Sequence, residues 1–182
     1  IIQARFSSKR LPGKVLKKCC GKPLLKWTIE RISSIKKPPK IVVATSSNDS
    51  DDNIYRFCKE NNIKCLRGSL NNVTKRMIDA CEEYKSSHFV RICGDSPIID
   101  PEILGNVLEI SKTVDVDIIT NTFHRTYPKG QSVELIKLSA LQNLFKEDLS
   151  ESEKEHVTKG FYNRSNKYNI LNFTSKDEKK IK

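Results

Sequence analysis

A group of cationic side chains follows the first apolar residues of the chain, within residues 1–14 (IIQARFSSKRLPGK). These cations are Arg5, Lys9, Arg10 and Lys14. Cations and exposed backbone N–H groups in a turn after a strand can hold a polyphosphate. The spacing matches neither the P-loop nor the glycine motif of dinucleotide sites. The alternative, an ordinary solvated loop, stays open at this point.

A second candidate is Asp95, which follows the apolar run 89–93 in the bend GDSP. A carboxylate at the end of a buried strand can hold Mg²⁺, which binds through one or two carboxylates together with substrate phosphates. The alternative is a turn residue, because Asp-Ser-Pro is also ordinary turn chemistry. Combined with the cationic segment, Asp95 favours a site for a metal-bound phosphate.

Zinc and disulfide chemistry find no support in the sequence. None of the six cysteines forms C-x-x-C, and the three histidines lie far apart along the chain. This excludes the usual zinc-ligand spacing. We expect Cys58, Cys81 and Cys93, which fall within apolar patterns, to be reduced core residues of a cytoplasmic protein.

The charge balance restricts the class of ligand. Lys and Arg number 33 against 22 Asp and Glu, a net charge of +11. This suits anionic ligands such as nucleotides or acidic sugars, or it reflects only a lysine-rich surface. No basic strand carries interleaved aromatic residues, so a nucleic-acid partner is not expected. No apolar run has the length of a membrane span, so a membrane partner is not expected either.

Alternating strands and helices must position these residues. Apolar patterns predict strands at residues 1–4, 40–46, 64–69, 89–93, 117–121, 132–136 and 168–173. Helices are predicted from Pro23 to about Ile35, around residues 54–58, and over 73–84, 100–112, 139–145 and 151–164. The pattern predicts a single α/β domain, residues 1–182, with a mainly parallel sheet. Ligands of such sheets bind beyond the carboxyl ends of the strands, so the loops there should meet at one rim.

Taken together and in order, several segments resemble the sugar cytidylyltransferases. They are IIQARFSSKRLPGK, GKPLLKW, IVVATSSN, LRGSLNNV, VRICGDSPIIDPE, TYPKG with SVE, and EHVT. The chain resembles the spore-coat polysaccharide type, which is related to the acylneuraminate and ketodeoxyoctonate cytidylyltransferases. The resemblance implies a three-layer nucleotide-diphospho-sugar transferase (Rossmann-like) fold with a mainly parallel mixed sheet. It also implies transfer of CMP from CTP to a sugar, with Mg²⁺ and release of pyrophosphate.

The resemblance assigns roles to residues that match family motifs. The catalytic set would be Arg5, Lys14 and Asp95, with Asp95 as the metal ligand. The nucleotide site would comprise Gln3, Ala4, Arg5, Ser8, Arg10, Lys14, Thr45, Arg67, Gly68, Ser69 and Gly94. The acceptor site would comprise Arg125, Tyr127, Lys129, Gly130, Glu134, His156 and Thr158. Three alternatives stay open: His156 as a structural hydrogen-bonding residue, Tyr127 as a packed loop aromatic, and Glu134 as an ordinary strand residue.

The physical demands of the reaction fit these roles. A sugar hydroxyl attacks the α-phosphorus of a polyanion, so cations and Mg²⁺ must neutralise the phosphates. Positioning then supplies most of the catalysis. The resemblance further implies CTP and a sugar, such as an acidic nonulosonic acid, as substrates. A cytoplasmic location, a role in cell-surface polysaccharide biosynthesis and a homodimer are also expectations.

Three departures from the family pattern stand out. Lys154 precedes Glu155-His156 where the family has Arg, and Asn71 and Asn72 stand where it often has an acidic residue. The second metal-binding aspartate of the family has no counterpart, since Asp177 lacks the matching context. We therefore expect a chain truncated at both ends. The alternatives are a non-catalytic nucleotide-binding remnant or a sister nucleotidyltransferase that uses another triphosphate.

Overall fold

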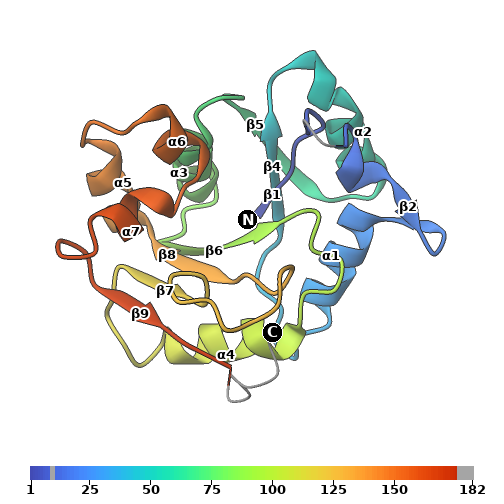
Figure 1. Ribbon diagram of the computed structural model, residues 1–182. Helices are drawn as coiled ribbons and strands as arrows, with labels where there is room; N and C mark the ends of the chain where they lie inside the picture. Colours follow the sequence, from blue (N-terminus) through green and yellow to red (C-terminus); the bar gives the residue numbers. More distant parts are fainter. Residues whose placement is uncertain (9–10, 176–182) are drawn as a thin grey trace.

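A seven-stranded sheet forms the middle layer of the computed structural model, which describes residues 1–8 and 11–175 (Figure 1). Its strands, in the order β5-β4-β1-β6-β8-β7-β9, are β5 (Lys64–Gly68), β4 (Val42–Ser46), β1 (Ile2–Gln3), β6 (His88–Cys93), β8 (Glu134–Lys137), β7 (Ile118–Thr120) and β9 (Ile170–Asn172). Every pair is parallel except the two that involve β8, which runs antiparallel to β6 and β7. The prediction of a mainly parallel mixed sheet is confirmed.

Helices cover both faces of this sheet. They are α1 (Leu24–Ser33), α2 (Asp52–Glu60), α3 (Val73–Glu83), α4 (Pro101–Ile110), α5 (Leu138–Phe145), α6 (Glu151–Glu155) and α7 (Lys159–Asn163), with 3₁₀ turns η1 (Lys14–Leu16) and η2 (Asp49–Asp51). One core cluster joins α1, α2 and α4 to the sheet, and a second joins α3, α5 and α7. Val43 belongs to the first cluster and Ala44 to the second, because successive strand residues point to opposite faces. The three-layer expectation is confirmed.

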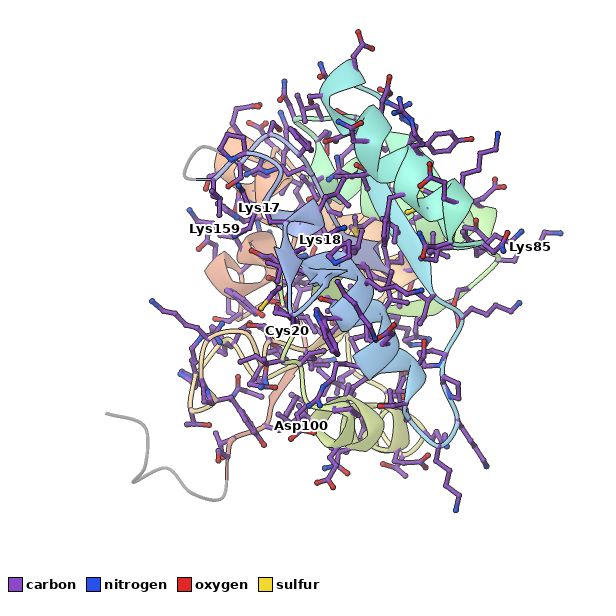
Figure 2. The ribbon with its side chains drawn as sticks, turned by 90° about the vertical axis from the view of Figure 1, so that its right-hand side faces the viewer. Lys17, Lys18, Cys20, Lys85, Asp100 and Lys159 are labelled. Carbon is purple, nitrogen blue, oxygen red and sulfur yellow. The ribbon has the colours of Figure 1, made fainter. Side chains whose placement is uncertain are left out.

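Local sequence explains most element boundaries. All five residues of β4 are buried, as a continuous apolar run in a parallel sheet predicts. Helix α4 begins after Asp100, whose side chain accepts a hydrogen bond from Glu102 N at 2.9 Å, with Pro101 in the first turn. Asp100 is labelled at this helix start in Figure 2. Within the described residues, no helix has the length and apolar character needed to cross a bilayer.

The region between α1 and the cationic loop differs from the prediction. A short hairpin pairs β2 (Lys18–Cys19) with β3 (Lys22–Pro23), and Pro23 is therefore the N-cap of α1 instead of part of its first turn. The turn residues Cys20 and Gly21 both have positive φ, which allows so tight a reversal. Figure 2 views the molecule from the side of this exposed hairpin.

The helix expected over residues 151–164 is also corrected, since α6 and α7 are separate. A capping box between Ser150 and Glu153 starts α6, and His156 leaves the helical conformation at φ −107° and ψ 83°. Thr158 then turns inward, is buried, and donates a hydrogen bond from its hydroxyl to Glu134. The tertiary contact of Thr158 therefore outweighs the local helical pattern.

Candidate functional site

The carboxyl ends of six strands lie at one rim, as their common direction requires, and the sixth is β9, which runs parallel to β7. Strands β1, β4, β5 and β6 run parallel, and β7 points the same way because it pairs antiparallel with β8. Glu134 begins the antiparallel β8 at this same rim. The loops after β1 and β6 and the helix α6 bring the candidate residues together here, as described below.

The cationic loop after β1 is closed upon itself at Phe6. The carbonyl of Phe6 accepts hydrogen bonds from Ser8 N and Gly13 N, both at 2.8 Å. Gly13 has φ +70°, and a Cβ at this position would lie 2.8 Å from the Phe6 ring, so any other residue would be strained here and would displace that ring. The next residue, Lys14, begins η1, whose Val15 is buried. Lys14 is thereby held beside the end of β1.

Lys14 forms an ion pair with Asp95, the residue predicted to bind metal. The side chains are 31% and 33% exposed, so a ligand can reach both. Within the described part of the chain, the Asp95 carboxylate has no second ion-pair or hydrogen-bond partner. A hard carboxylate of this kind fits Mg²⁺ with phosphate and water ligands. The described residues hold no group of three or more side chains that could bind a metal ion.

Arg5, the other described cation of the predicted catalytic set, pairs with Glu155 of α6 at 2.8 Å. This contact joins the loop after β1 to the EHVT segment. The adjacent His156 is exposed, and its ring makes no hydrogen bond within the described residues, so the structural alternative for it gains no support. Ser8 accepts a hydrogen bond from Leu11 N at 3.4 Å. Arg10 and Asp177 lie outside the described residues.

A buried ion pair between Arg91 and Glu134 lies next to this rim. Arg91 Nε also donates to Gln3 Oε1 at 2.8 Å, so the Gln3 side chain predicted for the nucleotide site holds Arg91. Sequence analysis did not single out Arg91, although a charged residue inside the apolar strand pattern VRIC was a signal for it. Register brings the two together, because Arg91 lies opposite Glu134 in the β6–β8 ladder.

The second oxygen of Glu134 is surrounded by hydroxyl groups. Oε1 accepts hydrogen bonds from Thr158 at 2.7 Å, Thr122 at 2.9 Å and Tyr162 at 3.0 Å. Burial alone would raise the pKa of Glu134, but Arg91 and the hydrogen bonds together lower it. Glu134 is therefore a charged carboxylate with both oxygens hydrogen-bonded, and it holds Thr158 in place. Thr158 lies two residues after the exposed His156, with the buried Val157 between them.

The turn after β5 is organised by contacts within the protein. Arg67 pairs with Asp52 at 2.7 Å and lies over the ring of Tyr55, so it faces α2. A Cβ on Gly68 would lie 3.1 Å from Cγ of the buried Arg76. Ser69 accepts from Asn72 N at 3.0 Å. Among the described residues, Nε and Nη2 of Arg76 and the buried hydroxyl of Thr45 have no hydrogen-bond partner. The nucleotide roles predicted for Thr45, Arg67, Gly68 and Ser69 stay predictions.

Gly94 allows β6 to approach β1 closely at the rim. Its N–H donates to the carbonyl of Gln3 at 2.8 Å. A Cβ there would lie 3.2 Å from that carbonyl oxygen and 3.3 Å from Cβ of the buried Ala4. Close backbone packing beside Asp95 therefore involves Gln3, Ala4 and Gly94, and forms the floor of the site.

The predicted acceptor loop follows β7, which lies two strands beyond β6 in the sheet, on the side away from β1. Arg125 donates to Ser132 at 3.0 Å, and Lys129 is exposed. Tyr127 packs edge-on against Phe173 at 5.8 Å, the contact expected from its alternative as a packed loop aromatic. Gly130 has φ +92° and precedes Gln131.

Gln131, which sequence analysis missed, ties this loop to the segment after Asp95. Its amide donates to Ile98 O and accepts from Asp100 N, both at 2.7 Å. A cavity of about 460 Å³ lies at the opposite, amino-terminal ends of the strands, beside Ile1 and Val42, and is not part of this site.

Comparison with known proteins finds relatives with a shared family and fold. The family model for Cytidylyltransferase matches residues 1–179. The spore coat polysaccharide biosynthesis protein SpsF of Bacillus subtilis is 31% identical over 163 residues, which cover 87% of this chain and 67% of that protein. The 3-deoxy-manno-octulosonate cytidylyltransferase of Saccharophagus degradans is 31% identical over 110 residues, 59% of this chain and 42% of that one.

A solved cytidylyltransferase structure is similar over nearly the whole chain. The protein from Leptospira borgpetersenii serovar Hardjo-bovis has a TM-score of 0.91 at 30% identity, covering 96% of this chain and 74% of that one. The family match and the similar solved structure therefore agree on the fold. The chain belongs to the cytidylyltransferase family, whose enzymes are CTP-dependent nucleotidyltransferases.

Proposed function

We propose that this protein transfers CMP from CTP to a sugar, with release of pyrophosphate. The observation that carries the proposal is the convergence of Lys14 and Asp95 at the rim, with Arg5 on the same loop as Lys14. An acidic sugar such as a nonulosonic acid is the proposed acceptor. The support comes from the 3-deoxy-manno-octulosonate enzymes among the relatives, and SpsF supports a role in polysaccharide biosynthesis.

In the proposed nucleotide site, cations of the loop after β1 bind the triphosphate. Lys14 and Arg5 are each paired with a carboxylate, and both pairs are partly exposed. A bound triphosphate would replace these carboxylates as the partner of each cation. Because opposite charge must gather where negative charge develops, such cations contribute mainly by electrostatic stabilisation and orientation. Ser8 and Arg10 belong to the same proposed site.

Asp95 is the residue proposed to hold Mg²⁺. When bound, the ion would neutralise negative charge on the reacting phosphate and on the departing pyrophosphate. The chain contributes the carboxylate, the cations beside it and the close floor formed by Gly94. Because Mg²⁺ usually binds through one or two carboxylates together with substrate phosphates, an ion that enters with the nucleotide would suit Asp95.

The proposed acceptor side combines cationic and hydroxyl-bearing residues. Arg125, Lys129 and His156 are exposed and suit the carboxylate of an acidic sugar. Glu134 is fully hydrogen-bonded, so its proposed part is to hold Thr158 and, through it, His156 in place. Tyr127 and Gly130 complete the acceptor loop. A cytoplasmic location and a homodimer are included in the proposal as expectations from the family resemblance.

A substrate screen tests this function. The protein would be incubated with Mg²⁺, each of the four nucleoside triphosphates and a panel of acidic and neutral sugars, with pyrophosphate release as the readout. We expect release only with CTP and an acidic sugar. Equal release with UTP or GTP would contradict CTP specificity, and release with neutral sugars alone would contradict the acidic acceptor. Calorimetric binding of CTP without turnover would instead identify a nucleotide-binding protein without this activity.

A further inference from the structure

The loop that carries Arg5 and Lys14 is anchored by the carboxylate of Asp51, which bonds to the Phe6 backbone and not to the charged group of either cation in the described part of the chain. Asp51, in η2, is fully buried. Its Oδ1 accepts a hydrogen bond from Phe6 N at 2.6 Å. Phe6 is the residue at which the loop leaves β1 and upon which it closes, through its carbonyl, at Gly13. Asp51 therefore holds the base of the loop.

The other oxygen of Asp51 is fixed to the neighbouring strand. Oδ2 accepts hydrogen bonds from Ser46 N, at 2.9 Å, and from the Ser46 hydroxyl. Ser46 is the last residue of β4, which pairs in parallel with β1. One buried carboxylate thus joins the carboxyl end of β4 to the first residues of the cationic loop. It is positioned by the rigid sheet and not by the loop itself.

A buried charge in this position needs a reason. Removing a carboxylate from water is costly, and a polar serine or amide could have satisfied the Phe6 N–H more cheaply. The carboxylate of Asp51 raises the pKa of the nearby buried Arg76 guanidinium and so stabilises its charged form. Burial nevertheless lowers the pKa of Arg76 to about 10. A carboxylate accepts several N–H and O–H bonds at once and holds them more strongly than a neutral acceptor does.

We infer that Asp51 is a positioning residue, which acts through Phe6 to place the cations of the loop after β1 against the phosphates of the nucleotide. The inference rests on the proposed nucleotide site. If the anchor is lost, the loop keeps its charges but not their position relative to Asp95. The affinity for the β- and γ-phosphates should then fall, whereas contacts to the nucleoside and α-phosphate should remain.

Calorimetry with CTP and CMP, both in Mg²⁺, separates positioning from general damage. For Asp51→Asn we expect CTP binding to weaken roughly tenfold, the scale of one lost hydrogen bond to a charged group. CMP binding should stay within about twofold, because CMP lacks the outer phosphates. The matched control is Asp49→Asn, an exposed carboxylate of the same 3₁₀ turn, which should leave both affinities unchanged.

Other outcomes overturn the inference. Equal weakening of CTP and CMP by Asp51→Asn would mean a merely structural role, and unchanged CTP binding would mean no role. If Asp51→Asn does not fold, Ser46→Ala removes one donor to the same carboxylate, and a CTP-selective loss of about threefold is expected. A wild-type chain that binds neither nucleotide would contradict the proposed function itself, and with it the inference.

Discussion

Lys14 Nζ and Asp95 Oδ2 form an ion pair at the carboxyl rim of the sheet, although they lie far apart in the sequence. They meet because β1 and β6 are parallel neighbours, with Gln3 opposite Cys93. The loop after each strand delivers one member of the pair. A magnesium-bound triphosphate would offer each of them a new partner of opposite charge, which is the basis of the first prediction.

Replacing Asp95 should abolish turnover without unfolding the protein. We expect Asp95→Asn to lower pyrophosphate release by roughly two to three orders of magnitude, the usual cost of losing a key electrostatic group. The free energy of unfolding in urea should change by less than about 1 kcal/mol, because the pair with Lys14 is partly exposed. Asp115→Asn, which removes an exposed ion pair with Lys137, is the control. More than one tenth of wild-type activity in Asp95→Asn would contradict the assignment.

Removing Glu155 should strengthen nucleotide binding. Its carboxylate is paired with Arg5 and would repel an incoming triphosphate. We expect Glu155→Gln to raise CTP affinity by up to about fivefold at low salt, with less gain at high salt. Calorimetry at two salt concentrations measures this. Glu151→Gln, in the same helix and paired with Lys154, should have little effect, and a weaker affinity in Glu155→Gln would show that the pair instead supports the site.

Breaking the buried pair of Arg91 and Glu134 should cost stability. Glu134→Gln leaves the guanidinium of Arg91 buried without its countercharge, which typically costs about 3–5 kcal/mol. Urea unfolding compares this variant with Glu102→Gln, a substitution on the exposed face of α4. A loss below about 1 kcal/mol would mean that the hydroxyl groups around Glu134 stabilise an uncharged amide equally well.

Glu153 should make the protein sensitive to acid. Hydrogen bonds from Arg164, the backbone of Ser150 and Asn163 lower the pKa of Glu153 to about 2 from its usual 4.5. The unfolded state therefore takes up a proton first as the pH falls. The contribution of Glu153 to the free energy of unfolding is complete above about pH 4.5 and is lost as the pH falls to about 2. Urea unfolding across this range should show a shallower loss in Glu153→Gln than in the wild type, and equal slopes would refute the link.

Gly13→Ala should distort the cationic loop. The substitution forces a side chain into a left-handed backbone and places its Cβ 2.8 Å from the Phe6 ring. We expect a loss of about 1–3 kcal/mol in unfolding free energy and weaker CTP binding. Gly21→Ala is the matched control, since Gly21 has φ +79° but nothing within 4 Å of the added Cβ. If both variants lose the same stability, the strain of a side chain at positive φ explains the whole loss, and the contact with Phe6 contributes nothing.

The motif order and the apolar periodicity correctly predicted the layers of the fold and the loops at its rim. The buried strand β4 and the start of α4 at Asp100 depend on residues that are adjacent in the sequence, so local patterns were enough to predict them. The helical pattern over residues 151–164 was misleading, because it contained no information about the buried contact between Thr158 and Glu134.

Only the tertiary structure decided which side chains touch. The sequence alone determined that cations follow the first strand and that Asp95 follows a later one. The contacts of Asp51 with Phe6 and of Arg91 with Glu134 join segments that are remote in the chain. Both contacts depend on the order of the strands, and the pair of Arg91 and Glu134 depends also on register, because a shift of one residue would turn either of these two side chains to the opposite face of the sheet. Long-range pairing therefore completed the site that local sequence could only outline.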